Sequence, residues 1–530
     1  MLDYLITGAT VYDGVTDAPR RLSVGIKGER IAYVGPLLST SAAERVIHAP
    51  ECFLCPGFID THASTGLGYR FPHAGDNKLF QGVTTEIIGN CGTSTGPVGE
   101  RLVPTMQRLA EQIGFSFDWR TLGEWFDRVE AYGLPFSVGT FVGHSTLRGG
   151  VCTDMQQVTR NDIDRMGAMV DQAMQDGALG LSTGLVYAPG SFAETREIMD
   201  LARVVARHGG LYVSHIRDER QELEAAIDEA IEIGRAARVP VLVSHLKAAE
   251  RPNWGKIPRV IERIEAARTE GLPITFEVYP YTATSTKLRT FIPKAVLSDG
   301  VAGMTEKLRA EPWRQRSVDW LRARGTDFDA MVLITEPVPD AAGRSIQQVA
   351  EAYEQDPAHM VVDLLLRDPD TWIIYHCMDE ADVDAAVLWD ASIICSDSWS
   401  YPVNAPRQIG HPHPRTYGAF TRFLEQYALK RPRMSFGRAI RKITSYPARW
   451  LKLPLRGRIA EGYFADLVLL DPARVREKAT FADPRRFSEG TEYVWVNGTL
   501  MLEQGTVYEK MPGRVLRLER PAPQAPPART

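Results

Sequence analysis

Polar side chains that bind metals or move protons follow several predicted strands at the point where each strand ends. They are Asp60, His62, Cys91, His215, His245 and Asp397. His215 and His245 each follow a serine, and about one strand–helix repeat separates them. A thiolate together with imidazoles favours zinc over other metals. We therefore predict that Cys91, His215 and His245 bind a metal ion, with Asp397 in the same register.

A scaffold that gathers strand ends at one face is needed to bring these side chains together. Short β-rich runs alternate with helical patterns between about residues 53 and 445, which favours an α/β fold with a parallel (β/α)8 barrel. A barrel of this kind has eight strands, so one of nine candidates lies outside it. The candidates are 53–61, 83–90, 135–143, 177–182, 211–215, 239–245, 273–279, 372–377 and 391–397.

The two chain ends share a different texture, with short alternating strands and frequent turns. We predict a small β-sandwich domain formed by residues 1–55 and 450–518, with the barrel at 56–449. A charged segment at 284–371 interrupts the strand–helix rhythm and is typical of an insertion or lid at the strand-end face. The Pro- and Ala-rich residues 519–530 are predicted to be a disordered tail.

Composition excludes several classes of protein. The 530 residues include 61 Lys and Arg against 66 Asp and Glu, so the net charge of −5 gives no basic footprint for nucleic acid. No apolar run reaches the roughly 18 residues of a membrane span. No signal peptide is recognisable, so we expect a cytoplasmic protein with mostly reduced cysteines. The lone Cys52-x-x-Cys55 is therefore interpreted as structural.

A set of motifs spread over nearly the whole chain resembles the amidohydrolase superfamily. PGFIDTH (56–62) and GRIAEGYFADLVLLDP (457–472) carry that general likeness. A more specific resemblance, to the N-acyl-D-amino-acid deacylase (D-aminoacylase) family, rests on further motifs. These are QGVTTEIIGNCGTSTGP (81–97), VGHSTLR (142–148), GALGLSTGLVYAPGSFAET (177–195), SHIRDE (214–219), SHLKAA (244–249), VYPYTA (278–283), HPRTYGAFTRFL (413–424), VWVNG (494–498) and PGRVLR (512–517).

The resemblance implies roles for individual residues. It implies a (β/α)8 barrel with a β-sandwich from both termini and a tightly bound zinc ion on Cys91, His215 and His245. Asp397 matches the general base of the family. The positions that hold the α-carboxylate of a small-molecule substrate are Lys247, Tyr279 and Arg415, and a lysine, a phenol and an arginine fork are suitable donors for that group.

One departure from the family pattern concerns a second metal position. The family has His-x-His after the first barrel strand, whereas this chain has His62-Ala63-Ser64. A neutral hydroxyl binds zinc far more weakly than imidazole does. We therefore expect one tight zinc per chain and a doubtful second site, with His62 idle, hydrogen-bonding or a partial ligand.

The resemblance implies a zinc-dependent amidohydrolase that cleaves an N-acyl-D-amino acid into a carboxylate and a free amino acid. Zinc would lower the pKa of bound water, and Asp397 would move the proton. His144 is either a further catalytic donor or the partner in a structural hydrogen bond. Two alternatives stay open, namely hydrolysis of another amide or cyclic amide and a catalytically weak metal-binding paralogue. Neither a nucleic acid nor a membrane partner is expected, and the sequence fixes neither the side-chain preference nor the oligomeric state.

Overall fold

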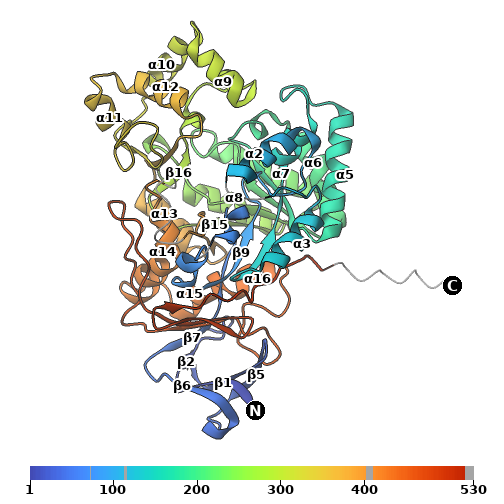
Figure 1. The fold of residues 1–530 in the computed structure, drawn as a ribbon, viewed down its shortest axis with the longest axis vertical. Coiled ribbons are helices and arrows are strands. Elements are labelled where there is room, and N and C mark those ends of the chain that lie inside the picture. Colours follow the sequence, from blue (N-terminus) through green and yellow to red (C-terminus); the bar gives the residue numbers. More distant parts are fainter. Residues whose placement is uncertain (72, 113–115, 402–409, 520–530) are drawn as a thin grey trace, which may run out of the picture.

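A computed structural model describes residues 1–71, 73–112, 116–401 and 410–519 of the chain (Figure 1). The predicted disordered tail at 519–530 lies outside the described residues, apart from Glu519. No helix in the described ranges is both long enough and apolar enough to cross a membrane.

The core of the molecule is a parallel barrel. Hydrogen bonding joins its strands in two runs, β10-β9-β8 and β11-β12-β13-β14-β15-β19. A parallel bridge between Ala63 and Ser398 joins the two ends of this series, and β10 continues directly into β11. The strands are β8 (Phe58–Asp60), β9 (Val83–Ile88), β10 (Ser137–Thr140), β11 (Val142–Gly143), β12 (Gly180–Gly184), β13 (Leu211–His215), β14 (Val241–Val243), β15 (Ile274–Val278) and β19 (Ile393–Ile394).

Amphipathic helices cover the outside of the barrel (Figure 1). In α7, for example, Leu223, Ile227 and Ile231 repeat at helical spacing and are buried. A Thr159–Asp162 capping box starts α5, so two of its backbone N–H groups are satisfied. The covering helices include α3 (Leu122–Tyr132), α5 (Arg160–Asp176), α6 (Thr195–Arg207), α7 (Leu223–Ala237), α8 (Ile257–Thr269), α13 (Glu380–Leu388) and α15 (Phe436–Ile443).

One of the nine predicted strands, at 372–377, lies outside the barrel. β18 (Trp372–His376) pairs antiparallel with β16 (Ala283–Lys287) and β17 (Met331–Leu333). This small sheet carries a helical cap of α9 (Gly300–Arg309), α10 (Trp313–Ala323), α11 (Ile346–Ala352) and α12 (Pro357–Arg367), which stands at one end of the molecule (Figure 1). The insertion between β15 and β19 therefore includes β18 in addition to the predicted segment 284–371.

The opposite end of the molecule holds two further sheets. One is built from N-terminal strands alone, and the other combines strands from both ends of the chain. The first has the order β5-β4-β1-β6 and is formed by β1 (Leu2–Thr7), β4 (Ser23–Lys27), β5 (Arg30–Gly35) and β6 (Ala43–His48). The second has the order β23-β22-β21-β20-β7-β2-β3 and includes β3 (Arg20–Arg21), β21 (Thr491–Val496), β22 (Thr499–Glu503) and β23 (Thr506–Val507). β7 (Phe53–Pro56) lies between β2 (Thr10–Val11) and β20 (Leu467–Leu470), so the N-terminal and C-terminal strands meet within one sheet. The fold is the predicted (β/α)8 barrel with a small β-sandwich from both termini.

Candidate active site

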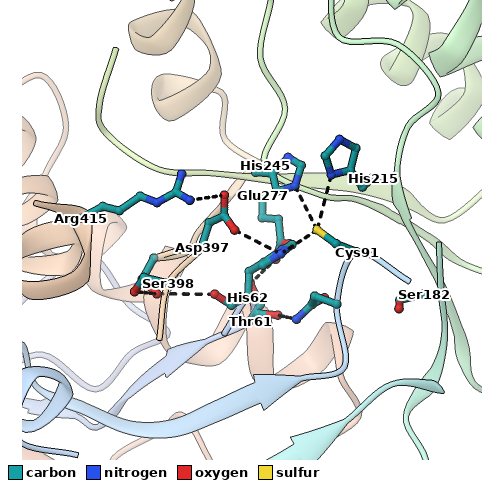
Figure 2. Close-up of polar contacts among 12 residues, drawn as sticks. Thr61, His62, Cys91, Ser182, His215, His245, Glu277, Asp397, Ser398 and Arg415 are labelled. Atoms are coloured by element: carbon teal, nitrogen blue, oxygen red, sulfur yellow. Dashed lines mark hydrogen bonds and ion pairs between the residues drawn. The ribbon is translucent and has the colours of Figure 1, made fainter. Parts of the chain in front are cut away.

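One thiol and three imidazoles meet at the C-terminal face of the barrel (Figure 2). The Cys91 Sγ lies 3.3 Å from His62 Nε2, 3.4 Å from His245 Nε2 and 3.5 Å from His215 Nδ1. A single thiol carries one proton and cannot satisfy three ring nitrogens as a donor. The donor set is the one that zinc prefers, and tetrahedral zinc bonds of about 2.0–2.3 Å place sulfur and nitrogen ligands roughly 3.5 Å apart. The residues present therefore fit a zinc ion.

Backbone strain coincides with these side chains. Cys91, His245 and Asp397 have φ values of 51°, 33° and 48°, in a region that residues with a side chain rarely adopt. The Cys91 turn is also tightly packed, because a Cβ on Gly184 would lie 2.2 Å from the Cys91 carbonyl oxygen. Strain of this kind persists where the surrounding structure imposes it, and here it aims the three side chains at one point.

Electrostatics favour the metal-binding form of two of these side chains, Cys91 and His215. Burial raises the pKa of the Cys91 thiol, but the neighbouring His62 and His245 outweigh burial and hold that pKa below its ordinary value. Burial lowers the pKa of His215 to about 4, against the opposing effect of Glu219. A thiolate and a neutral imidazole are the forms that bind metal.

Asp397 lies between the cluster and a buried arginine (Figure 2). Its Oδ2 lies 2.9 Å from Arg415 Nη2, and its Oδ1 lies 3.4 Å from His62 Nε2. Burial raises the pKa of this carboxyl, but Arg415 and the histidines outweigh burial, so the pKa lies well below its ordinary value. Asp397 is therefore an ionised acceptor beside the metal cluster.

His62 belongs to the cluster rather than standing apart from it. Its Nδ1 contacts a Glu277 carboxylate oxygen, and the Thr61 hydroxyl donates to the same carboxylate. This second contact orients the ring, so Nε2 points at Cys91. The sequence reasoning did not single out Glu277, although an acid inside the apolar run 273–279 was a usable signal.

Lys247 lies in the site but is already engaged. Its Nζ lies 2.6 Å from Glu219 Oε1 and 2.7 Å from His245 Nδ1. Glu219 therefore ties Lys247 to the histidine cluster and lies 3.6 Å from His215 Nε2 as well. Sequence reasoning missed Glu219, which stands four residues after His215 in the motif SHIRDE.

Arg415 and Tyr279 stack beside Lys247. The Arg415 guanidinium carbon lies 4.4 Å from the centre of the Tyr279 ring, and the Lys247 Nζ lies 5.8 Å from it. Arg415 Nη1 is buried and has no hydrogen-bond partner among the residues that the structure describes. A buried donor without an acceptor costs stability unless a ligand or water accepts from it. This corner of the site is thus suited to an anion.

His144 takes a different place from the other predicted site residues. It begins α4 (His144–Val151), and its Nε2 lies 2.7 Å from Glu197 Oε1 in a buried pair. It does not line the cavity above Cys91. The geometry therefore corresponds to the structural hydrogen bond that was the alternative for this residue.

A cavity of about 660 Å³ opens above the cluster. Cys91, His215, His245, Asp397 and Arg415 lie on its floor or walls, together with the exposed Ser64. The Ser64 backbone N–H donates to the Ser398 carbonyl at 3.1 Å. A volume of this size is in the range of small-molecule sites.

A second buried cluster of charges lies behind Asp397 and away from the cavity. Lys78 Nζ lies 2.6 Å from Asp60 Oδ2 and 3.2 Å from Glu86 Oε1. The same ammonium group donates to the Ser396 and Ser398 hydroxyls, which flank Asp397 in the chain. We call Asp60, Lys78 and Glu86 the Lys78 cluster.

Comparison with known proteins extends the picture over the whole chain. Residues 405–501 match a family model described as "Amidohydrolase family". The chain is 34% identical over 526 residues to N-acyl-D-glutamate deacylase of Alcaligenes xylosoxydans xylosoxydans, covering 99% of this chain and 98% of the relative. D-aminoacylase of the same organism is 33% identical over 515 residues, or 97% of each chain. This chain belongs to the D-aminoacylase family of amidohydrolases.

A solved structure shares the same architecture. It is the N-acyl-D-glutamate deacylase from Bordetella bronchiseptica, complexed with zinc and a phosphonate inhibitor that mimics the tetrahedral intermediate of the reaction. The TM-score is 0.83 at 30% sequence identity, with 97% of this chain and 99% of that chain covered. The family resemblance inferred from the motifs is confirmed, and the D-aminoacylase family likeness includes both the barrel and the terminal β-sandwich.

Proposed function

We propose that this protein is a zinc-dependent amidohydrolase that cleaves the amide bond of an N-acyl-D-amino acid. Water adds to the acyl carbon, the C–N bond breaks, and the products are a carboxylate and a free D-amino acid. The observation that carries the proposal is the convergence of three imidazoles on the single sulfur of Cys91 next to the Asp397–Arg415 pair. The names of the full-length relatives and the zinc held by the Bordetella enzyme support it.

The proposed zinc ligands are Cys91, His215 and His245, with His62 as a further contact. When bound there, zinc would make water acidic enough to yield a nucleophile near neutral pH. Since Ser64 offers only a neutral hydroxyl where the family pattern has a second histidine, we propose one tightly held zinc per chain.

Asp397 is the proposed base. As an ionised carboxylate at the cavity floor, it accepts a proton from the attacking water and returns that proton to the nitrogen of the leaving amine. Its ion pair with Arg415 fixes the direction of the carboxylate, while His62 lies at its other oxygen. These contacts fix the position of the proton carrier before substrate arrives.

Arg415, Lys247 and Tyr279 form the proposed clamp for the substrate α-carboxylate. Within the described part of the chain, Arg415 Nη1 has no hydrogen-bond partner. Lys247 donates one of its three N–H groups to Glu219, which also lies 3.2 Å from His245 Nδ1, so Lys247 keeps N–H groups for substrate. A carboxylate between these groups would form charge-assisted hydrogen bonds. The clamp sets the orientation of the amide relative to Asp397.

The proposed enzyme acts on a small molecule in the cytoplasm, and its six cysteines are free thiols, as reducing conditions would keep them. A panel of N-acetyl-D- and N-acetyl-L-amino acids, assayed on enzyme of known zinc content, tests the proposal. We expect turnover of D-substrates only. Opening of hydantoins without deacylation would favour a cyclic-amide hydrolase. Stoichiometric zinc without any turnover would favour a metal-binding paralogue.

A further inference from the structure

The walls of the cavity come from two sides of the barrel and from the inserted sheet, which contributes residues such as Thr286 and Trp372. Lys247, Tyr279 and Arg415 follow the sixth, seventh and eighth strands, which are β14, β15 and β19. The opposite wall is formed by segments that follow β8, β9 and β12, on the far side of the metal cluster. If the clamp holds the carboxylate of the substrate, the acyl group must point toward this opposite wall.

The opposite wall becomes apolar toward the mouth of the cavity. Phe71 and Leu109 line the cavity and are each 45% exposed, while Met106 lies one turn before Leu109 on α2 (Val103–Gln112). Deeper in the cavity the same wall is polar, because the hydroxyls of Thr95 and Ser145 are fully buried there. Exposed large apolar side chains around a cavity mouth mark a place where an apolar ligand contacts the protein.

The volume of the cavity exceeds the needs of a small acyl group. Pockets of about 300–1,000 Å³ hold drug-sized ligands, which are larger than an N-acetyl amino acid of about a dozen non-hydrogen atoms. The cavity measures about 660 Å³.

We infer that this enzyme selects N-acyl-D-amino acids whose acyl group is an alkyl chain of about six to ten carbons, lying along α2 against Met106, Leu109 and Phe71. The inference rests on the proposed function and adds the chemical class of the acyl group. Short chains contact only the polar part of the wall, so added carbons improve binding only once the chain reaches α2. Each methylene buried there then contributes about a fourfold gain.

A homologous series of substrates tests the inference. N-acetyl, N-butanoyl, N-hexanoyl, N-octanoyl and N-decanoyl derivatives of one D-amino acid are compared by kcat/KM on the zinc-loaded enzyme. We expect little change from acetyl to butanoyl and a gain of at least tenfold from hexanoyl to octanoyl. In Leu109→Ser, the ratio of octanoyl to acetyl kcat/KM should fall at least fivefold.

Leu455→Ser is the matched control. Leu455 is also 45% exposed but does not line the cavity, so this variant should keep the wild-type ratio. Calorimetry on metal-free enzyme supplies a readout besides turnover, in which the N-octanoyl compound should bind at least tenfold more tightly than the N-acetyl compound.

The outcomes separate the two proposals. Equal kcat/KM across the series, with good turnover of the N-acetyl compound, would overturn the acyl-chain inference and leave the proposed function standing. A loss of selectivity in Leu455→Ser as large as in Leu109→Ser would also overturn it. If no N-acyl-D-amino acid is hydrolysed, the proposed function fails, and the calorimetric comparison alone then decides whether the apolar wall binds an alkyl chain.

Discussion

Two clusters of buried ionisable side chains lie on opposite sides of the segment that carries Asp397. In the cluster around Cys91, ring nitrogens and a guanidinium N–H lack sufficient partners, the backbone is strained, and a cavity gives access. In the Lys78 cluster the ammonium group pairs with both carboxylates, and none of the three residues lines the cavity above Cys91. Burial of charge alone therefore does not identify a functional site, whereas spare hydrogen-bonding capacity facing a cavity does.

The Lys78 cluster nevertheless supports the cluster around Cys91. Asp60 accepts from the Ser396 backbone N–H at 3.0 Å, and Lys78 donates to the Ser396 and Ser398 hydroxyls. Glu86 accepts from the Ser400 hydroxyl at 2.7 Å. Alternate residues of the segment are thus fixed from behind, and Asp397, which lies between them, projects toward the metal ligands.

The largest effect is expected from the cluster around Cys91. Cys91→Ala removes the sulfur that three imidazoles share, so zinc binding and turnover should be lost together. We expect kcat to fall at least a thousandfold, about 4 kcal/mol in the barrier. Metal analysis and kcat on the same preparation check this. Cys52→Ala, at a thiol remote from the cavity, should keep both, and full activity in Cys91→Ala would contradict the ligand assignment.

A substitution in the Lys78 cluster should lower the stability of the fold. Lys78→Met leaves the buried carboxylates of Asp60 and Glu86 without their shared cation, so the free energy of unfolding should fall by about 3–5 kcal/mol. Urea denaturation measures this change. Lys27→Met is the control, because Lys27 pairs with Asp3 at an exposed position and its loss should leave stability unchanged. An unaltered urea midpoint in Lys78→Met would mean that the cluster does not stabilise the fold.

An intermediate effect is expected at Arg415, which faces the cavity and also pairs with Asp397. Arg415→Lys keeps the charge but loses the planar fork, so kcat/KM should fall at least tenfold, about 1.4 kcal/mol. The loss should be greater for a substrate with a free carboxylate than for its amide. Equal losses on both substrates, or a lowered Tm with unchanged kinetics, would argue against a carboxylate clamp.

The smallest effect on activity should come from Ser64, at the edge of the cluster around Cys91. Ser64→His supplies an imidazole at the cavity, so a second metal should bind while kcat stays within about twofold. Metal content per chain and kcat are measured together. Ser398, whose carbonyl oxygen accepts from the Ser64 N–H, is buried beside the Lys78 cluster, so Ser398→His should instead destabilise the protein. Unchanged metal content in Ser64→His would show that this position does not contribute to a second site.

Much of the barrel and the central residues of the site could be predicted, because strand ends in a parallel barrel meet at one face. The sequence alone therefore predicts that Cys91, His215, His245 and Asp397 lie close together. It could not separate β18 from the barrel strands. A short apolar run reads the same whether it pairs in parallel inside a barrel or antiparallel in an insertion.

Residues that act through other residues were harder to predict. Glu277 lies within a strand and Glu219 lies in the loop after His215, and both are recognisable only once His62, His245 and Lys247 are placed around them. His144, in the motif VGHSTLR, was predicted to be either a further catalytic donor or the partner in a structural hydrogen bond. The structure turns its ring to Glu197, and only the packing of α4 decides that direction.

The pairing of β7 with β20 has a consequence for biosynthesis. These neighbours in one sheet are separated by about 400 residues of chain, and a ribosome adding 5–20 residues per second needs roughly 20–80 s to make that stretch. During this time the edge of β7 that β20 later covers is open, and an open strand edge is a template for wrong pairing. Completion of the sheet that contains β7 thus waits until the C-terminal strands have been translated.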